Sequence, residues 1–357
     1  ICGRARRPGA VVNILLATDA WAPQVNGVVR TLTQVIRELG IMGHRVSTVQ
    51  PALFRSIPCP LYPEIRLALG VHRRIGNIIE AFAPDAIHIS TEGPVGVAVR
   101  RWCRRNGYEF TTAFHTRFPE YLADRWLAPP RLIYALLRRF HAPATAVMVP
   151  SASIRAELSA RGFAKLVAWG RGVDPELFSP ARGKGLDLPR PIFLSVGRVA
   201  PEKNLPAFLS LDLPGSKVVI GEGPQLAAQR QQFPQAHFLG RRTNGELAGL
   251  YAAADVFVFP SRTDTFGLVM LEALASGLPV AAYPVAGPLD VIGNSGAGVL
   301  DEDLRRAAMA ALEIPREHCR AHALNFTWRA SATQFLQNLQ PCRGMAAAGP
   351  QSAHAAQ

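Results

Sequence analysis

Short apolar runs alternate with amphipathic segments along the chain, a pattern typical of parallel strands joined by crossover helices. In the first half the apolar runs predict strands, at residues 11–17, 45–50, 86–90, 109–114 and 146–150. Apolar residues at helical spacing predict helices between them, at residues 27–39, 94–106, 131–141 and 151–161. We therefore expect the first half to form one doubly wound α/β sheet.

The same pattern starts again after a proline-rich break at residues 175–191. It predicts strands at residues 192–196, 217–220, 236–239, 256–259, 280–283 and 298–300, and helices at 244–253, 267–276, 304–311 and 328–339. A length of 357 residues also favours two domains, because single cores tend to stop growing at about 250 residues. We expect domains at 11–178 and 190–326, a last helix at 327–340, and disordered ends at 1–10 and 341–357.

Composition and charge narrow the function classes. Hydrophobic residues make up 48% of the chain and charged residues 18%, which excludes a chain that is disordered throughout. The formal net charge is +13, and residues 1–178 hold 23 basic against 12 acidic side chains. The excess therefore lies in the first half, and it indicates an anionic partner such as nucleic acid, a membrane surface or a phosphorylated substrate. The competing interpretation is that the arginine runs are simply a solvated surface.

The five cysteines are scattered without the spacing of a zinc site or a disulfide framework, so a reducing cytoplasm is the simplest expectation. No apolar run approaches the roughly 20 residues that a bilayer-spanning helix needs. The first residues, ICGRARRPGA, contain no apolar segment of the kind a signal peptide requires, and we interpret them as a ragged start.

The first strand-to-helix turn contains Asn26 and Gly27 directly before a predicted helix. Glycine allows a ligand to approach the backbone, and the first N–H groups of a helix favour an anion. The alternative is an ordinary turn in which Asn26 caps the helix. In isolation, the two interpretations carry equal weight.

The second half opens with FLSVGRVAPEKN, in which Gly197 ends a strand and Arg198 and Lys203 follow it. A guanidinium and an ammonium reaching one place suit a diphosphate, and Lys203 is one of only four lysines in an arginine-rich chain. The next strand ends in IGEGPQ, where Gly221 and Gly223 predict a flexible loop at the same sheet edge.

The stretch PSRTDTFGLVMLEALASGLPV is the most specific one. Asp264 lies in the loop after a strand, and Glu272 follows it by eight positions, two turns into the next helix. We expect the two carboxylates to meet different parts of one elongated ligand. The alternative, Asp264 near a helix cap and Glu272 on a solvated face, fits Glu272 poorly because its neighbours are apolar.

Together these segments resemble the retaining GT-B glycosyltransferases of family 4. The resemblance rests on the NGV turn, His115 in FHT, the RGVD stretch, VGRVAPEKN, IGEGP and the D-x7-E form of the E-x7-E motif, in order from about residue 11 to 339. Within the family the chain is most similar to bacterial enzymes that glycosylate membrane lipids. The resemblance implies two Rossmann-like domains that face each other across a cleft, with the last helix packing back on the first domain.

The family pattern implies roles for the charged residues. Arg198 and Lys203 match the pair that binds the nucleotide diphosphate and stabilises it as leaving group. Glu272 matches the carboxylate that accepts from ribose hydroxyls, and Asp264 the acid that faces the donor sugar. Most of the family has Glu at the position of Asp264, and the shorter side chain leaves the identity of the sugar open.

The family pattern also implies a backbone-lined pocket for sugar and phosphate at Phe266, Gly267 and Leu268. Gly27 would lie across the cleft from them, and His115 would lie near the transferred sugar. From the residues alone, a single histidine after a strand is more often structural, so the role of His115 depends on the resemblance.

The implied reaction is glycosyl transfer from a nucleotide sugar, with UDP-sugars favoured over GDP-mannose, with retention at the anomeric carbon and without a metal or other cofactor. No Asp-x-Asp pair precedes the donor loop, which agrees with a metal-free site. The resemblance also implies that the first domain, the half of net +11, holds the acceptor. Arginines alternate with apolar residues there at near-helical spacing, in 72–82, 100–106 and 131–141.

From these segments we predict attachment to anionic lipid on the inner face of the cell membrane, with a lipid acceptor such as diacylglycerol. The competing hypotheses are a soluble or polysaccharide acceptor, a non-catalytic nucleotide-sugar binder, and a nucleic-acid-binding protein. The last of these has only the charge in its favour, because no nucleic-acid-binding motif accompanies it. The sequence does not indicate an oligomeric state.

Overall fold

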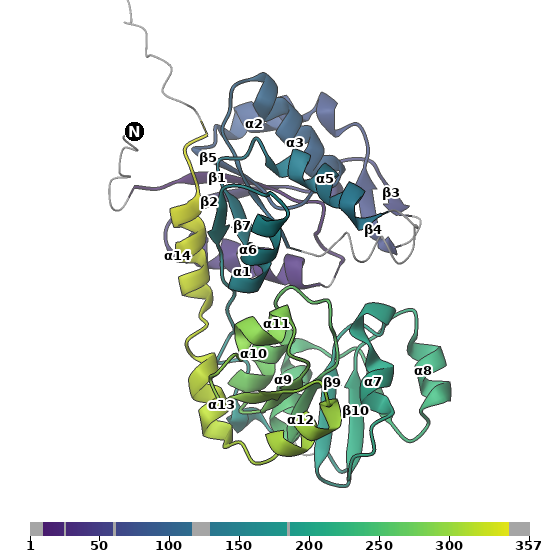
Figure 1. The fold of residues 1–357 in the computed structure, drawn as a ribbon. Helices are drawn as coiled ribbons and strands as arrows, with labels where there is room; N and C mark the ends of the chain where they lie inside the picture. Colours follow the sequence, from purple (N-terminus) through teal and green to yellow (C-terminus); the bar gives the residue numbers. More distant parts are fainter. Residues whose placement is uncertain (1–9, 25, 60–61, 116–128, 184–185, 343–357) are drawn as a thin grey trace, which may run out of the picture.

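The computed structural model describes residues 10–24, 26–59, 62–115, 129–183 and 186–342. The chain forms two lobes, each built on a parallel sheet with helices on both faces (Figure 1). Within the described ranges, none of the helices combines the length and the apolar character that crossing a bilayer requires. The two Rossmann-like lobes are the GT-B arrangement expected from the sequence.

The first sheet has six parallel strands in the order β2-β1-β5-β6-β7-β8. These strands are β1 (Asn13–Ala17), β2 (Arg45–Val49), β5 (Ala86–Ile89), β6 (Thr111–Ala113), β7 (Val147–Val149) and β8 (Leu166–Ala168). Around them lie helices α1 (Gly27–Ile41), α2 (Ile75–Phe82), α3 (Pro94–Arg105), α5 (Pro130–His141) and α6 (Ala152–Ala160), with the antiparallel hairpin β3 (Ser56–Cys59) and β4 (Tyr62–Ala68).

Strand β1 shows why this sheet is covered on both sides. Successive side chains of a strand point to opposite faces. Ile14 and Leu16 enter the core shared with α1 and the C-terminal helix, whereas Leu15 and Ala17 enter the core shared with α2 and α3. A strand that is buried on both faces must be a continuous apolar run, and this is the signal that predicted it.

The second sheet has the order β11-β10-β9-β12-β13-β14, again all parallel. Its strands are β9 (Ile192–Val196), β10 (Ser216–Ile220), β11 (His237–Gly240), β12 (Val256–Phe259), β13 (Val280–Ala282) and β14 (Gly298–Leu300). Its helices are α7 (Leu205–Leu209), α8 (Leu226–Gln232), α9 (Asn244–Ala253), α10 (Leu268–Ala275), α11 (Ala286–Val291), α12 (Leu304–Ala311) and α13 (Arg316–Ala323). Among the described residues there are also four short 3-10 helices: Pro51–Leu53, Val71–Arg73, Pro180–Arg182 and Pro201–Lys203.

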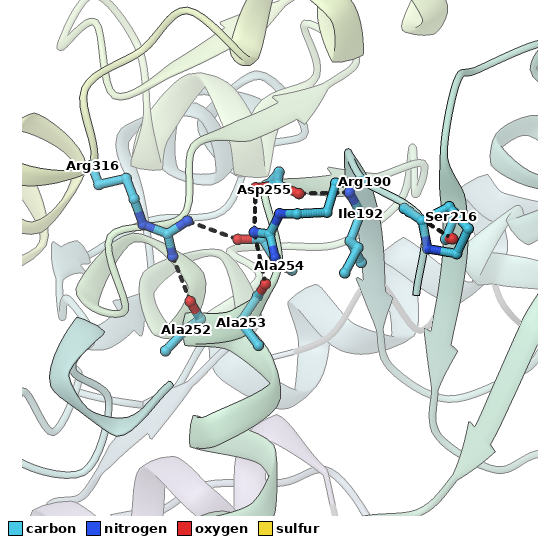
Figure 2. Close-up of polar contacts among 9 residues, drawn as sticks. Arg190, Ile192, Ser216, Ala252, Ala253, Ala254, Asp255 and Arg316 are labelled. Atoms are coloured by element: carbon cyan, nitrogen blue, oxygen red, sulfur yellow. Dashed lines mark hydrogen bonds and ion pairs between the residues drawn. The ribbon is translucent and has the colours of Figure 1, made fainter. Parts of the chain in front are cut away.

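A polar network closes the amino-terminal edge of the second sheet (Figure 2). Asp255 accepts from the backbone N–H of Ile192 at 2.7 Å and from Arg190 at 2.6 Å. Arg316 donates to the carbonyls of Ala252 and Ala254, at the end of α9, where a helix has carbonyls without intrahelical partners. These groups are used for the structure of this edge, which leaves the opposite, carboxyl edge as the place for a ligand.

The last helix, α14 (Trp328–Asn338), crosses back to the first lobe and packs along α1. Trp328, Ala332 and Phe335 belong to the core that β1 and α1 build. The chain remains docked beyond the helix, because Cys342 is buried and its backbone N–H donates to the Asp85 carbonyl at 2.9 Å. The expectation of disorder from residue 341 was therefore wrong for Pro341 and Cys342, while residues 1–9 and 343–357 lie outside the described residues.

The strands predicted from apolar runs are all present, with ends that differ by at most two residues. The sequence pattern did not predict the hairpin β3–β4, the edge strand β8, or helices α7, α8, α11 and α13. The hairpin contains Pro58 and charged residues, so it has neither an apolar run nor a strict alternation. Helices of five or six residues such as α7 and α11 are too short to show a helical period.

We predict that Phe335→Ala lowers the free energy of unfolding by about 3 kcal/mol, because it leaves a cavity where α14 meets the first lobe. Gln337→Ala on the exposed side of the same helix is the matched control and should change stability by less than about 0.5 kcal/mol. Urea unfolding of both variants measures the difference. Equal effects would show that α14 is not an integral part of this core.

Candidate functional site

The candidate site lies at the carboxyl edge of the second sheet, between its neighbouring strands β9 and β12. The chain runs outward from β9 to β11 and returns to β12 on the other side, so the loops after β9 and β12 leave the sheet in a shared crevice. Ligands of doubly wound folds bind at such a switch point. The loop after β9 carries Arg198 and Lys203, and the loop after β12 carries Asp264.

Lys203 and Asp264 form an ion pair across this crevice. The ammonium donates to Oδ1 of Asp264 at 2.6 Å, and the two side chains are 25% and 17% exposed. The second carboxylate oxygen, Oδ2, is buried and has no hydrogen-bond partner among the described residues. Arg198 is half-buried at the end of β9 on the same loop as Lys203. The sequence thus predicted residues that lie together, and the structure adds that Lys203 and Asp264 bind each other.

The two loops are held by further hydrogen bonds. The Glu202 carbonyl accepts from Ser261 Oγ at 3.1 Å and from Thr263 Oγ1 at 3.4 Å. Asn204, which adopts a left-handed backbone conformation with φ of 50°, donates to the Pro260 carbonyl at 3.1 Å. The loop that carries Lys203 is therefore positioned by the loop that carries Asp264.

The glycines after β9 and β10 have a structural reason that the sequence did not reveal. A Cβ atom on Gly221 would lie 1.8 Å from the Gly197 carbonyl, and one on Gly223 would lie 2.3 Å from the Val199 carbonyl. Both glycines thus allow two strand ends to touch, and the Val199 N–H donates to the Glu222 carbonyl at 2.9 Å. The loop that contains Gly221 and Gly223 thus packs against the loop after β9. The flexibility of this loop and the contact of these glycines with a ligand stay predictions.

Helices α1 and α10 begin opposite each other across the domain boundary. A Cβ on Gly27, the first residue of α1, would be 3.8 Å from Leu268 Cδ1, at the start of α10. Asn26 caps α1 by accepting from the backbone N–H groups of Val28 and Val29, so the capping alternative is the observed one. Among the described residues helix α10 has no side-chain cap, and Gly267, with φ of 83°, precedes it. The uncapped α10 end is therefore the better place for an anion.

A third helix end, the start of α3, is already occupied. The buried carboxylate of Asp19 accepts from the backbone N–H groups of Val95 and Gly96, in the first turn of α3, and from Thr91 Oγ1 at 2.8 Å. Burial raises the pKa of Asp19, and these three hydrogen bonds oppose the rise. Asp19 thus has the structural role of a cap supplied by the loop after β1.

Glu272 is buried in α10 and has a partner from the other lobe. Its Oε1 accepts from Nη1 of Arg30, on α1, and its Oε2 accepts from the hydroxyl of Tyr251 at 3.2 Å. Burial raises the pKa of Glu272, while Arg30 and the Tyr251 hydroxyl lower it. The Glu272 carboxylate is therefore engaged on both oxygens in this structure, and its predicted ribose contact is not tested by it.

His115, just beyond the end of β6, is joined to the same region. Thr265, next to Asp264, donates from Oγ1 to the His115 carbonyl at 2.8 Å. Arg171 donates from Nη2 to Nδ1 of His115 at 3.3 Å. Residues 116–128, which follow His115, are outside the described part of the chain. His115 therefore lies at the domain boundary near the D-x7-E loop, and its proximity to a transferred sugar stays a prediction.

Phe266 and Leu268 flank Gly267 and join this loop to both lobes. Phe266 is buried in the core of the second domain, and Leu268 packs against cores of both domains. The Asp264 and Phe266 carbonyls run close to Gly287, where an added Cβ would be 3.1 Å from each. The backbone around Gly267 is therefore packed into a defined position.

Sequence reasoning missed Arg30, Tyr251 and Arg171. Arg30 carried one usable signal, because a cation in the first turn of a helix faces the positive end of the helix dipole and needs a compensating partner. Arg171 belonged to the RGVD stretch, but nothing local indicated its contact with His115. In chemical terms the assembled site offers cations and an open helix end for an anion, and carboxylates for hydroxyl groups.

Residues 25–177 match the family described as Glycosyltransferase Family 4, and residues 181–314 match Glycosyl transferases group 1. The chain is 28% identical to a GDP-mannose-dependent alpha-mannosyltransferase of Mycobacterium tuberculosis, over 93% of this chain and 97% of that protein. It is 35% identical to a sulfoquinovosyl transferase of Arabidopsis thaliana, over 67% of this chain and 50% of that protein. It is 28% identical to an alpha-monoglucosyldiacylglycerol synthase of Streptococcus pneumoniae, over 84% and 78%.

Among solved structures, sucrose-phosphate synthase from Thermosynechococcus elongatus superposes with a TM-score of 0.75. The alignment covers 91% of this chain and 98% of that one, at 21% sequence identity. This likeness supports the two-domain fold.

We predict that Arg30→Met lowers stability by about 2 kcal/mol at neutral pH, because Glu272 then remains buried without its cation. Loss of Arg30 raises the already raised pKa of Glu272 further. A group whose pKa is raised in the folded state contributes stability that is fully present below its unfolded-state pKa and is lost as the pH rises through its folded-state pKa. The loss of stability in Arg30→Met should therefore nearly vanish near pH 4 and grow toward pH 7.

Chemical unfolding at several pH values measures this dependence. Arg37→Met, at an exposed position of the same helix, is the control. In Arg30→Met/Glu272→Gln the growth with pH should disappear. A defect of equal size at pH 4 and pH 7 would argue against the buried ion pair.

Proposed function

Because this chain belongs to the family 4 glycosyltransferases of GT-B fold, we propose that it transfers a hexosyl or uronosyl group from a nucleotide sugar to a lipid acceptor such as diacylglycerol. In this proposal the reaction retains the anomeric configuration and needs no metal. The donor is a UDP-sugar, with GDP-mannose as the second option because a relative uses it by name.

The observation that carries the proposal is the group formed by Arg198, Lys203 and the uncapped start of α10 at one switch point. When the bond between the sugar C1 and the diphosphate oxygen breaks, negative charge accumulates on the departing phosphate. Cations and helix N–H groups that are already oriented stabilise this charge without reorganisation. The acceptor oxygen bonds to C1 from the same face, and the departing phosphate takes its proton.

The carboxylates then recognise hydroxyl groups. Asp264 has one buried oxygen without a partner among the described residues, which suits a hydroxyl of the donor sugar. Glu272 would accept from the ribose, and for this the contact with Arg30 must loosen. Because the starts of α1 and α10 lie so close that an added Cβ on Gly27 would be 3.8 Å from Leu268, donor entry requires the two lobes to separate at this point. Closure of the two lobes after the donor has bound would exclude water from the reacting centre.

The surface of α3 and α5 supports a lipid acceptor at an anionic membrane. A hollow of 440 Å³ is lined by Val97 and four arginines of α3: Arg100, Arg101, Arg104 and Arg105. Arg100 donates to the Phe140 and Arg139 carbonyls, which joins α3 to α5. On α5, Leu132 and Leu136 are 57% and 60% exposed, and they lie one turn apart on one stripe.

The arginines of this α3–α5 surface repel one another. Partial burial lowers the pKa of Arg100, and the charges of Arg104 and Arg139 lower it further. An anionic headgroup would relieve this repulsion while the exposed leucines entered the interfacial region, as in basic amphipathic helices. The relative named alpha-monoglucosyldiacylglycerol synthase also supports a lipid acceptor.

Incubating the purified protein with each nucleotide sugar and a membrane lipid extract, and identifying the product by mass, tests the proposal. We predict a glycolipid product, and a fall in kcat of about 100-fold in Arg198→Ala because one stabilising cation is lost. Arg242→Ala, exposed in the same domain, should have wild-type activity. Equal activity of all three proteins would overturn the assigned role of Arg198.

The glycosyl-transfer assay and a DNA-binding assay together distinguish the alternative functions. Turnover with water-soluble sugars but not with lipids would favour a soluble or polysaccharide acceptor. Nucleotide-sugar binding without any product would indicate a non-catalytic binder. A salt-dependent gel shift with DNA at physiological ionic strength would favour a nucleic-acid-binding protein.

We also predict that the protein sediments with vesicles containing anionic lipid and is released by salt. Arg101→Glu/Arg104→Glu should reduce binding at least tenfold, because it reverses two charges of the α3–α5 surface. Arg241→Glu/Arg242→Glu changes the net charge by the same amount on the second domain and should leave binding unchanged. Equal losses in the two variants would assign binding to total charge alone.

A further inference from the structure

His115 has two different ring nitrogens in this structure. Its Nδ1 lies 3.3 Å from Nη2 of Arg171, whereas its Nε2 is buried and has no hydrogen-bond partner within the described part of the chain. Buried polar atoms of proteins are nearly always hydrogen-bonded, so an exception at a ligand site calls for an explanation.

The contact with Arg171 determines which nitrogen carries the proton. A guanidinium has only N–H donors, so Nδ1 of His115 must accept with its lone pair. In a neutral imidazole, the proton is then on Nε2. A doubly protonated ring would place an N–H of His115 against an N–H of Arg171, which the geometry disfavours.

Arg171 is itself held firmly. It is only 6% exposed, and its Nη1 donates to the carbonyls of Trp169 and Gly170. Its guanidinium lies over the Trp169 ring at 4.6 Å, and the ring of His115 meets the same indole edge-on at 5.4 Å. Burial lowers the pKa of Arg171 to about 9, so it remains charged at neutral pH, and no carboxylate pairs with it among the described residues.

The other titratable neighbours of His115 act in the same direction as Arg171. Burial holds the pKa of His115 well below its usual value, and the charges of Arg171, His88 and His141 lower it further. His88 is a buried histidine whose own pKa is lowered to about 3, chiefly by burial. The ring of His115 is therefore surrounded by groups that disfavour a second proton.

We propose that Arg171 is a positioning residue that holds His115 in the neutral Nε2–H tautomer, so that His115 presents a hydrogen-bond donor to an oxygen of the bound nucleotide sugar. The contact with the donor rests on the proposed function, whereas the tautomer does not. His115 is then not the base of the reaction, because its lone pair is used by Arg171.

The buried charge behind the ring also strengthens the donor. A cation next to Nδ1 polarises the imidazole and makes the Nε2–H more acidic, which favours an electron-rich oxygen as its partner. The nearby hydrogen bond from Thr265 to the His115 carbonyl fixes the distance between this ring and the Asp264 loop. Arg171 thus acts on the ligand only through His115.

Nitrogen-15 NMR of the full chain, labelled at the imidazoles of its nine histidines, tests the tautomer without any assay of activity. The His115 signals are assigned by their loss in His115→Gln. We expect Nε2 protonated and Nδ1 unprotonated, without titration between pH 5.5 and about 8. Arg171→Met should allow the Nδ1–H form or a titrating ring, and Arg171→Lys should restore the wild-type signals.

A protonated Nδ1 in the wild-type protein, or unchanged signals in Arg171→Met, would overturn the proposal. If Arg171→Met fails to fold, the wild-type spectrum still decides the tautomer. The expected tautomer without any glycosyl transfer would contradict the proposed function and leave the assignment of Arg171 intact.

Kinetics test the contact with the donor. Arg171→Met should lower kcat/KM for the nucleotide sugar about tenfold, mainly through KM, which corresponds to one charge-assisted hydrogen bond. Arg171→Lys should recover most of the loss. Because Arg171 acts through His115, Arg171→Met should have no further effect in the His115→Gln background. Additive losses would contradict the coupling.

Discussion

The ion pair between Arg30 and Glu272 joins the two lobes, together with the hydrogen bonds from Thr265 to the His115 carbonyl and from the Ser153 N–H to Asp290. A buried carboxylate costs several kcal/mol unless a cation and hydrogen bonds compensate it. Tyr251 supplies one hydrogen bond from the domain that contains Glu272, but the cation comes from α1 of the other domain. Neither lobe alone satisfies this carboxylate, so their relative position is constrained by charge geometry as well as by the apolar contact at Leu268.

The core of each lobe was predictable because its strands are parallel and buried on both faces, which requires continuous apolar runs such as residues 11–17 and 256–259. Edge elements do not have this requirement. Strand β8 has only three residues, none of them fully buried, and the hairpin β3–β4 has a register shift next to Pro58. Their positions depend on the tertiary neighbours that cover them, which local sequence does not report.

The residues of the candidate site also fall into a group that the sequence predicted and a group that it did not. Arg198, Lys203 and Asp264 were predicted because they lie on two loops that a switch point brings together, and Glu272 because it is a carboxylate among apolar residues of the following helix. The contact of Arg30 with Glu272 joins residues 242 positions apart, and that of Arg171 with His115 joins residues 56 apart. No spacing rule reaches across these distances. These two arginines therefore had to be found from their partners in the fold.

The pairing of Lys203 with Asp264 has a consequence for the order of recognition under the proposed function. A diphosphate carries more negative charge than one carboxylate, so it competes for the Lys203 ammonium when it reaches this crevice. As Lys203 turns to the phosphate, Asp264 loses its partner and becomes available to accept from a sugar hydroxyl. A free diphosphate would leave that carboxylate uncompensated, whereas an intact nucleotide sugar satisfies both groups. Under the proposed function, the ion pair between Lys203 and Asp264 would thus couple phosphate binding to recognition of the sugar.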